Sequence, residues 1–454
     1  MKYSPHPLLT STVALILLGL GWQGCSAGKP KGQAPVVLEY WEKWTGFERE
    51  AMARLVDEFN SSQNRIFVRF LSVSRIDQKM MLATAGGVPP DVVGLWDVNL
   101  PSYAENNALL PLDRLAREAG LREKDYLPVF WKLCHYRGHQ WALPSTPSVV
   151  ALHWNKKMFR EAGLDPERPP RTLAELESFN EKITRKNSDG SLAQIGHMPQ
   201  EPGWWMPDFP SWFGGASWDG GPHLLLDSPS NRAFFQWLQS YPARFGGSEL
   251  FKLRGGFGTF ASPDNPFFQG KVAMILQGVW MDNFIRQYAP EGFSYGVAPF
   301  PESTPHPEAP LTIAQTDILV IPTGTRHPRE AMEFISFVQQ QKHMESLCMA
   351  QRKLSPLAKV SDDFYRRHPH PYLREFQRLS QSPRAQPTLC LPTMREYSND
   401  LIIYSNLVLL GRMNGEQARR EMAARQQKSL TAKLDRWERV SAVRTAVWDQ
   451  ELRP

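Results

Sequence analysis

The sequence predicts an α/β protein built of two lobes with a cleft between them, and three observations point to this fold. The chain has 454 residues, which is too long for one compact core and fits two or three folding units. Strand-and-helix units occur in two separate blocks. Further strands and helices follow the second block, so the chain must cross between the lobes more than once. In open α/β sheets, ligands bind at the carboxyl ends of the strands, which would line such a cleft.

The composition is that of a globular protein with an unusual supply of tryptophan. Apolar residues make up 42% of the chain, and the formal net charge of +6 is small for this length. Because the Lys and Arg residues are scattered rather than striped, we expect no nucleic-acid partner. Several of the 15 tryptophans lie in Gly/Pro-rich stretches, where a large ring either packs in a core or meets a ligand.

The N-terminus has the pattern of an export signal. Lys2 is followed by an apolar run from Leu8 to Gly21, which is shorter than the roughly 20 residues that span a bilayer. The stretch "GWQGCSAGK" then resembles a bacterial lipoprotein cleavage site. We therefore predict a signal peptide over residues 1–24 and a lipid on Cys25. Cleavage without lipidation and a short membrane anchor left in place stay open as alternatives.

The other cysteines carry no sign of metal or redox chemistry. Cys134, Cys348 and Cys390 have neither CxxC spacing nor histidine partners at ligand spacing, so we predict packing residues, with one disulfide as the alternative. The chain contains no HExxH and no GxSxG, and "GFGTFA" from Gly256 to Ala261 lacks the flanking strand and helix of a dinucleotide fingerprint. We predict no metal and no cofactor.

The first block opens with a strand–helix–strand unit. Residues 36–40 read as a strand, apolar residues between 51 and 59 recur at helical spacing, and "RIFVRF" alternates like a second strand. The two strands of such a unit should lie parallel. The pattern then repeats with a helix around residues 78–85, the strand "DVVGLW", and one helix over "LPSYAENNALLPLDRL".

The second block begins with "SVVALHWNKKMFREAGL", an apolar strand that runs into a helix. Thr172 can cap the next helix, and Glu175 can return the hydrogen bond. Residues 196–258 are rich in Trp, Gly and Pro and read as an irregular segment, the kind that carries specificity. "FFQGKVAMILQGVW" then ends a strand in a glycine and an unexplained tryptophan. Further strands follow in "FSYGVAPFP" and "DILVIP", and the rest of the chain is largely helical.

These pieces resemble the extracellular solute-binding proteins of ABC importers, a large family with maltose-, oligosaccharide- and glycerol-phosphate-binding members. The matching stretches follow the family order from Val36 to about Leu430: "VVLEYWEKWTGFE", "MLATAGGVPPDVVGLWD", "YAENNALLPLDRL", "WALPSTPSVVALHWNKKMFREAGLDPERPPRTLAEL", "FFQGKVAMILQGVWMDNFIRQYAPEGFSYGVAPFP" and "DILVIPTGTRHPREAMEFISFV". The resemblance implies a two-lobed periplasmic-binding-protein fold of the type II kind, with a hinge and an interlobe cleft. Such a protein closes around its ligand, docks on a membrane permease and has no catalytic activity.

The resemblance also implies where the lobes lie. The N-terminal lobe would hold residues 35–145 and 296–345, and the C-terminal lobe residues 150–293 and 346–434. Crossing strands near 144–149 and 295–299 would form the hinge. Residues 435–454 extend past the usual end of the family, and we expect them to add a packing helix.

Several tryptophans are placed at the cleft by the resemblance. "LQGVW" matches a strand–turn–aromatic pattern that puts Trp280 on the cleft wall, where an indole can pack on the C–H face of a pyranose. Trp44 follows the first strand, at the first ligand-contacting loop of the family. "GWWMPDFPSWFGG" occupies a variable ligand-facing loop, so at least one of Trp204, Trp205 and Trp212 should line the cleft. A core position for Trp280 and a lobe-packing role for Trp44 are the alternatives.

Polar candidates accompany these rings. Trp96 and Asp97 end the strand "DVVGLW", from which the family reaches its ligand. A carboxylate there can accept hydrogen bonds from two sugar hydroxyls, although it can also cap the next helix. Arg352 lies near a position where some members hold an anionic or polar ligand group; a solvated arginine is the alternative.

Two glutamines follow the same logic. Gln277 and Gln315 stand at strand ends, and their amides can donate and accept at the same time, which suits a hydroxyl-rich ligand or ordinary turn bonding. The family often carries Gly-Gly or Gly-Asp where this chain has Gln315 and Thr316. The ligand preference of other family members is therefore not inferred for this chain.

We therefore predict the substrate-binding protein of an ABC importer, which binds a sugar or oligosaccharide and delivers it unchanged to permease subunits. It would lie on the periplasmic or extracellular face of the cytoplasmic membrane, held by the lipid on Cys25. A secreted glycoside hydrolase is one alternative, but it needs two carboxylates that face each other across one bond, and the chain shows no paired signature. Asp97, Asp208, Asp219 and Asp282 are the candidates for such a pair. A carbohydrate-sensing or adhesive lipoprotein without a transporter is the other alternative.

Overall fold

The structure is a computed structural model that describes residues 34–451, with side chains described as far as Val440. The predicted signal peptide and Cys25 lie outside the described residues. Within the described part of the chain, no helix combines the length and the apolar character needed to cross a membrane.

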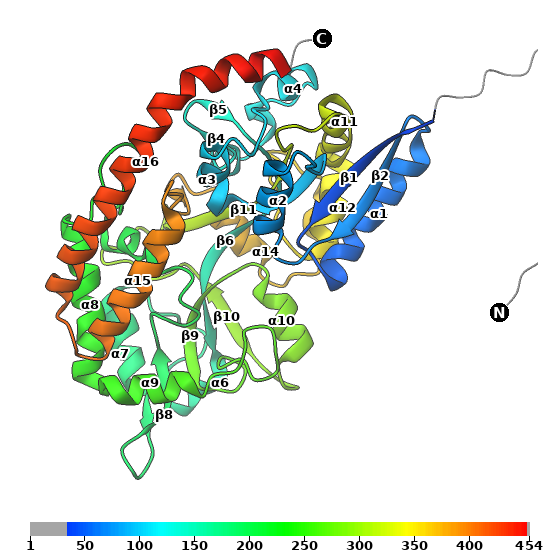
Figure 1. The fold of residues 1–454 in the computed structure, drawn as a ribbon. Helices are drawn as coiled ribbons and strands as arrows, with labels where there is room; N and C mark the ends of the chain where they lie inside the picture. Colours follow the sequence, from blue (N-terminus) through cyan, green and yellow to red (C-terminus); the bar gives the residue numbers. More distant parts are fainter. Residues whose placement is uncertain (1–33, 452–454) are drawn as a thin grey trace, which may run out of the picture.

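One mixed sheet runs through both halves of the molecule (Figure 1). Over residues 34–451 its strand order is β2-β1-β3-β11-β6-β9-β8-β7, with β10 paired to β6 and β12 paired to β11. The strands are β1 (Val36–Glu42), β2 (Ile66–Ser72), β3 (Val92–Trp96), β6 (Leu143–Asn155), β7 (Arg185–Lys186), β8 (Leu192–His197), β9 (Val272–Gly278), β10 (Tyr295–Ala298), β11 (Thr312–Val320) and β12 (Ala385–Pro387). β1 lies parallel to β2 and β3, as predicted, so these strands end at the same edge of the sheet.

The N-terminal lobe is the part that holds β1, β2 and β3. Its helices are α1 (Gly46–Ser62), α2 (Ile76–Ala85), α3 (Leu100–Glu105), α4 (Asp113–Glu118), α5 (Pro128–Lys132), α11 (Pro328–Gln339) and α12 (Gln341–Gln351). A short hairpin of β4 (His135–Tyr136) and β5 (His139–Gln140) completes it. One buried apolar cluster joins β1 and α1 to α11 and α12, and it extends through α13 (Asp362–Arg367) to α14 (Leu373–Ser380).

The C-terminal lobe is the part that holds β8 and β9. Its helices are α6 (Lys156–Glu161), α7 (Leu173–Ile183), α8 (Pro229–Phe245), α9 (Gly247–Gly255), α10 (Met281–Tyr288) and α15 (Met394–Leu409), with the 3-10 segment η3 (Met206–Phe213). Its buried cluster includes the apolar faces of α7 and α8. Residues between Leu391 and Met422, from the segment before α15 to the start of α16 (Gly415–Glu451), also belong to this cluster. The lobe boundaries expected from the sequence stay a prediction.

Strand β6 crosses from one lobe to the other. Its first half pairs with β11, and its second half, from Val150, pairs with β9 and β10. All of its residues from Leu143 to Asn155 are buried. The residues predicted as a hinge therefore lie on strands that both lobes share.

The long C-terminal helix α16 (Gly415–Glu451) lies along one side of the molecule, from α8 to the neighbourhood of α4 (Figure 1). Ala418 and Met422 pack in the core of the C-terminal lobe. Further along the same helix, Trp437 packs in a third buried cluster with Ile76 and Trp141 of the N-terminal lobe. Residues 435–451 continue α16, and this single helix touches both lobes.

Three local predictions differ from the structure. Residues 196–258 were predicted to be irregular, but their second half forms α8 and α9. The single helix predicted over residues 100–115 is wrong, because α3 ends at Glu105 and α4 begins at Asp113. Between them Asn107 has a left-handed backbone and Pro111 disfavours helix in the residue before it. Thr172 caps α7 as predicted, but the Glu175 carboxylate accepts its return hydrogen bond from the backbone of Arg171 instead.

The cysteines are packing residues, as predicted. Cys134, Cys348 and Cys390 are free thiols; the first two are buried and the third is half-buried. Among the described residues, no group of His, Cys, Asp and Glu side chains is arranged to hold a metal ion.

Candidate ligand-binding cleft

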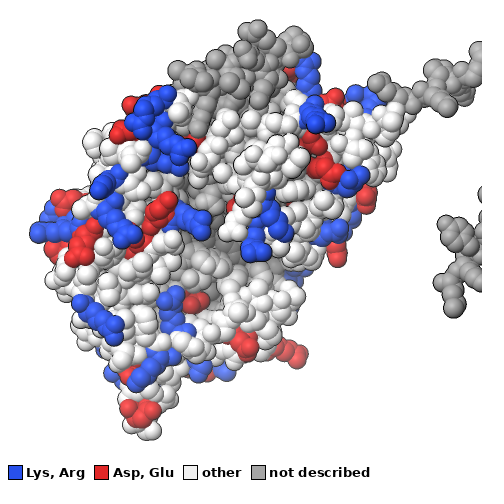
Figure 2. Space-filling view, viewed as in Figure 1, with Lys and Arg blue, Asp and Glu red and all other residues white. Residues whose placement is uncertain are grey.

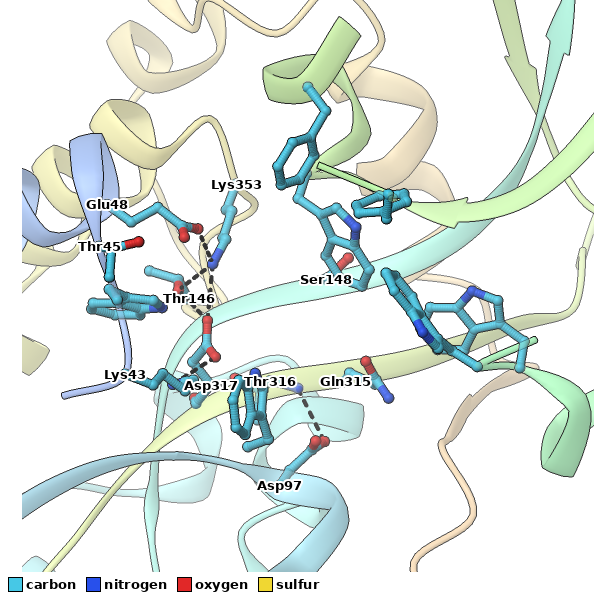
Figure 3. Close-up of a pocket in the computed structure, with 17 residues that line it drawn as sticks. Lys43, Thr45, Glu48, Asp97, Thr146, Ser148, Gln315, Thr316, Asp317 and Lys353 are labelled. Carbon is cyan, nitrogen blue, oxygen red and sulfur yellow. Dashed lines mark hydrogen bonds and ion pairs between the residues drawn. The ribbon is translucent and has the colours of Figure 1, made fainter. Parts of the chain in front are cut away.

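A cavity of about 520 Å³ lies between the lobes, within the usual range of roughly 300–1,000 Å³ for small-molecule sites (Figure 3). We call it the cleft cavity. Both lobes contribute to its lining, which consists of Lys43, Trp44, Thr45, Glu48, Trp96, Asp97, Thr146, Ser148, Trp204, Trp205, Phe260, Trp280, Phe284, Gln315, Thr316, Asp317 and Lys353.

Aromatic rings from the C-terminal lobe form one wall. Trp280 stacks on Trp205 with ring centroids 6.0 Å apart and an interplanar angle of 25°. Trp204 meets Phe260 edge-on at 4.7 Å, and Phe260 meets Phe284 at 4.9 Å. Because each ring is held by another, the wall is a preformed apolar surface rather than a set of independent side chains.

The glycine of "LQGVW" makes room for this wall. A Cβ on Gly278 would lie 2.5 Å from the ring of Trp280 and 2.7 Å from the hydroxyl of Ser148. Both contacts are shorter than any side chain tolerates, so the indole can lie over the end of β9 only because residue 278 lacks a side chain. Trp280 itself stands at the N-cap position of α10 and lines the cavity.

The rings on the N-terminal side play different parts. Trp96 ends β3 and is 46% exposed, so its face is available to a ligand. Trp44 lines the cavity but is only 4% exposed. The ammonium groups of Lys43 and Lys353 lie 4.9 and 5.4 Å from the centre of its ring, so Trp44 mainly supports two cations.

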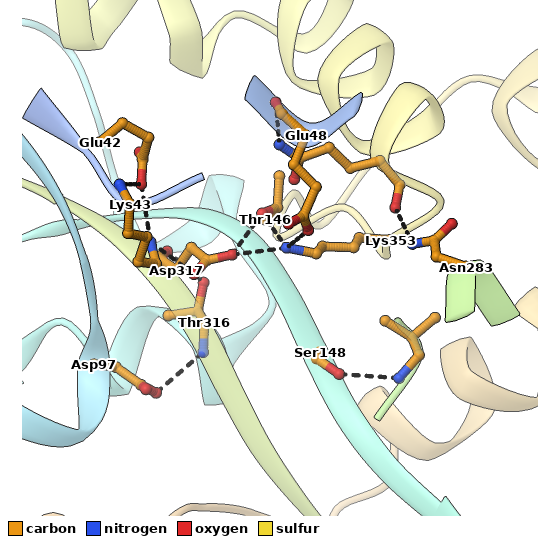
Figure 4. A network of polar contacts seen from close by, with 12 residues as sticks. Glu42, Lys43, Glu48, Asp97, Thr146, Ser148, Asn283, Thr316, Asp317 and Lys353 are labelled. Atoms are coloured by element: carbon orange, nitrogen blue, oxygen red, sulfur yellow. Dashed lines mark hydrogen bonds and ion pairs between the residues drawn. The ribbon is translucent and has the colours of Figure 1, made fainter. Parts of the chain in front are cut away.

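A buried ion-pair network forms the polar floor of the cleft cavity (Figure 4). The Asp317 carboxylate lies 2.9 Å from the amino group of Lys43 and 2.9 Å from that of Lys353. Thr146 donates a third hydrogen bond to Asp317 at 2.9 Å. Lys353 also pairs with Glu48 at 2.9 Å. The members come from the residue after β1, from α1, β6 and β11, and from the segment after α12, so the fold and not the local sequence brings them together.

The electrostatics of this floor follow from burial and pairing. Burial alone would raise the pKa of Asp317, but the charges of Lys353 and Lys43 outweigh it and lower the pKa to about 2. Burial opposes the charge on Lys353, yet Asp317 and Glu48 raise its pKa. Lys43 responds to Asp317 and Glu42 in the same way. The two cations are therefore fixed in charge and already matched by carboxylates.

Asp97 lies apart from this network, beside Thr316 (Figure 3). It is 2% exposed, and its carboxylate accepts a hydrogen bond from the backbone N–H of Thr316 at 3.0 Å. Burial raises the pKa of Asp97 to about 8, against the smaller opposing effect of that hydrogen bond. At neutral pH the group is largely a neutral acid, which can donate as well as accept. The N-cap positions of the following helices belong to Trp96 and Asn99 and not to Asp97.

Eight predicted site residues line the cleft cavity together: Trp44, Trp96, Asp97, Trp204, Trp205, Trp280, Gln315 and Thr316. Three others do not. Trp212 is 1% exposed and packs on Phe209 and Phe300 in the core. Arg352 donates to the side chain of Asn283 at 2.9 Å.

Gln277 is the third predicted residue outside the cleft cavity. It is fully buried on β9, and among the described residues neither amide atom has a hydrogen-bond partner.

Sequence reasoning missed the charged floor and two rings of the wall. Lys43 stands directly before Trp44, Asp317 directly after Thr316, and Lys353 directly after Arg352, so these three residues neighbour predicted ones. Glu48 and Thr146 of the floor do not. Phe260 belongs to the discounted "GFGTFA" stretch. Lys43 and Lys353 follow the ends of β1 and α12, so their signal was position just after a strand or helix. Asp317 lies within β11 and carried no such signal.

A family model described as bacterial extracellular solute-binding protein matches residues 48–345. The chain belongs to this family. Its curated relatives include the sn-glycerol-3-phosphate-binding periplasmic protein UgpB of Pectobacterium atrosepticum, 24% identical over 287 residues, or 59% of this chain and 61% of the relative. UgpB of Escherichia coli K12 is 24% identical over 317 residues, or 66% of this chain and 67% of the relative.

Solved structures agree with the fold. The structure described as "CpMnBP1 with Mannobiose Bound" has a TM-score of 0.74 and 26% identity, and covers 86% of this chain and 99% of its own. The sugar-binding protein MalE of Xanthomonas citri has a TM-score of 0.71 at 20% identity, and covers 89% and 99%. The predicted two-lobed α/β fold is confirmed.

Proposed function

We propose that this solute-binding protein serves an ABC importer and binds a neutral sugar or oligosaccharide in the cleft cavity. The supporting observation is the pairing of surfaces in one cavity. The stacked Trp280 and Trp205 lie on one side, and a hydrogen-bonding floor lies on the other. A pyranose has the same two-sided character, with C–H groups on its faces and hydroxyls around its rim.

The charge of the floor favours a neutral ligand over a phosphate ester. The curated relatives are named for sn-glycerol 3-phosphate, which needs cations that are free to pair with it. Here the ammonium of Lys353 is shared by Asp317 and Glu48, and that of Lys43 by Asp317 and Glu42. Among the described lining residues, each ammonium group already has carboxylate partners, so none is free to pair with a phosphate. The mannobiose-bound protein among the structural neighbours, by contrast, is named for a neutral disaccharide.

Ligand capture would use the two-lobed architecture. In the open form the lobes admit the sugar. When they close, the aromatic wall of the C-terminal lobe and the polar floor touch it together. Contacts that exist only in the closed form shift the population toward that form. β6 and β10 lie at the junction and would act as the hinge. The closed shape would then dock on the permease subunits.

The same geometry argues for binding without catalysis. Hydrolysis of a glycosidic bond needs one free carboxylate and one free carboxylic acid on opposite sides of it. Glu48 and Asp317 are both held by Lys353, which leaves Asp97 as the one lining carboxyl outside the network. We therefore propose that the sugar leaves unchanged. A periplasmic or extracellular location, with a lipid on Cys25 as the tether, completes the proposal.

A thermal-shift screen followed by calorimetry tests this function. The panel is mannobiose, mannotriose, maltotetraose, tagatose and sn-glycerol 3-phosphate. A sugar that binds only the folded protein raises its melting temperature by mass action, and we expect this for at least one neutral sugar but not for the phosphate. Chromatography of the recovered sugar should show it intact. A shift with the phosphate alone, or cleavage of the sugar, would contradict the proposal.

A further inference from the structure

A second cavity of about 970 Å³ adjoins the cleft cavity. Asp97 lines both, so the two cavities meet at this residue. Like the cleft cavity, the second one lies between the lobes: the N-terminal lobe contributes Leu100 and Tyr136, and the C-terminal lobe contributes Ser211 and Trp218. Figure 2 shows the face of the molecule hollowed between the two lobes, with Lys and Arg side chains bordering the hollow.

The outer wall of the second cavity is an aromatic and cationic platform. The hairpin of β4 and β5 turns through Arg137 and Gly138, which both have left-handed backbones, the geometry of a tight two-residue hairpin turn. Tyr136 meets Trp437 of α16 edge-on, with ring centroids 6.2 Å apart. The Arg137 guanidinium lies 5.6 Å from the centre of each ring and so fixes both.

The opposite wall offers a further ring and short polar groups. Trp218 is half-buried, and its indole N–H donates to the carbonyl of Gly221 at 2.7 Å, which holds the ring in place. Ser211 and Gln386 add groups that can donate and accept hydrogen bonds. Rings at both walls and hydroxyl or amide groups between them repeat the chemistry of the cleft cavity.

The charges around the second cavity favour a neutral guest. Lys132 and Arg137 are its cations, and Arg137 lies 4.0 Å from the carboxylate of Glu105. Asp97, Asp208 and Asp219 are its carboxyl groups, and Asp97 is largely neutral at neutral pH. Asp208 accepts hydrogen bonds from Thr388 and from the backbone of Leu389, and Asp219 accepts from the backbone of Gly221 and His223. Neither sign of charge dominates.

We propose that one neutral oligosaccharide occupies both cavities, passing Asp97, with its first rings on the aromatic wall of the cleft cavity and its far end against Trp437 and Trp218. This inference rests on the proposed function and adds a preference for ligand length. The family match ends at residue 345, so Trp437 brings an element from outside the matched region into the site. The far end of the ligand would therefore also touch a helix that packs on both lobes.

Calorimetric titration with linear manno- and malto-oligosaccharides, from disaccharide to hexasaccharide, tests the proposal. We expect the affinity of the wild type to rise with length until the second cavity is filled, by roughly tenfold for one well-stacked ring. Ala216 is exposed and lines the second cavity, so Ala216→Trp should narrow that cavity and reduce the gain with length while the disaccharide binds as before. Trp437→Ala should reduce the same gain from the other wall.

A matched control separates blockage from a general effect of a bulky substitution. Ala243 is exposed on α8 and lines neither cavity, so Ala243→Trp should bind every length like the wild type. Affinities that are independent of length, or a gain in Ala216→Trp as large as that of the wild type, would overturn this inference while disaccharide binding still supports the proposed function. Absence of binding by every sugar would overturn both.

Discussion

Gly278 and Trp280 depend on each other: the indole of Trp280 occupies the space that any side chain at position 278 would need. A Cβ there would lie 2.5 Å from the ring. This relationship explains why the strand β9 ends in a glycine two residues before the tryptophan. It also fixes the ring against Trp205, so the wall of the cleft cavity is set before a ligand arrives.

Replacement of Gly278 by alanine should therefore disturb the aromatic wall of the cleft cavity. We expect Gly278→Ala to push Trp280 off its position, to weaken sugar binding roughly three- to tenfold, and to cost about 1–3 kcal/mol of stability through overpacking. Calorimetry and denaturant unfolding measure the two effects. Gly255→Ala is the control, because a Cβ at that position meets nothing within 4 Å. Equal binding by both variants would show that the glycine does not position the ring.

The ion-pair floor should be sensitive to loss of its central carboxylate. Asp317→Asn leaves Lys43 and Lys353 buried with less compensating charge, and removal of one partner from a buried ion pair costs about 3–5 kcal/mol. Glu42 and Glu48 still face the two cations, so we expect a loss toward the lower end of that range in urea unfolding. The control Glu333→Gln removes an exposed pair with Arg65 and should change stability very little. A similar loss in both variants would contradict a special role for Asp317.

Asp97 should make the protein less stable as pH rises. Its pKa is about 8 in the folded protein and near 4 in an unfolded chain, so the folded state binds more protons between these values. The stability that this proton confers is complete below about pH 4 and is lost as pH rises through about 8. Asp97→Asn does not titrate, so its advantage in melting temperature over the wild type should grow from pH 4 to pH 8.5. A constant difference across that range would contradict the raised pKa.

Ligand binding should make the protein more compact. If the lobes close around a sugar, small-angle X-ray scattering should report a smaller radius of gyration at saturating ligand. The non-binding sugars of the same panel, at equal concentration, serve as the control. An unchanged radius with a bound ligand would mean that the sugar is held without lobe closure.

Sequence patterns predicted most of the strands and helices, and together with the family resemblance they predicted eight of the residues that line the cleft cavity. Local alternation and helical spacing identified β1, α1 and β9, because a buried face imposes its period on the chain. The break between α3 and α4 was missed because tertiary contacts decide that segment: the backbone of Leu110 donates to Ile321 far along the chain. Helix propensity alone does not reveal this long-range contact.

The site residues also fall into those that the sequence predicted and those that it did not. The strand-end pattern together with the family resemblance located Trp280 and Asp97. The Lys43–Asp317–Lys353 floor escaped because its members are far apart in sequence and meet only in the folded chain. Trp205 and Trp212 stand in one irregular stretch without a period, so no local signal could tell the wall residue from the core residue.

The most direct test of the account is a calorimetric titration of the best sugar from the panel into the wild type, Trp280→Ala and Trp131→Ala. Trp131 is half-buried and lines neither cavity, so its variant should bind like the wild type. We predict that Trp280→Ala loses roughly tenfold in affinity while it remains folded. Unchanged affinity in folded Trp280→Ala would contradict the claim that the sugar rests on this ring in the cleft.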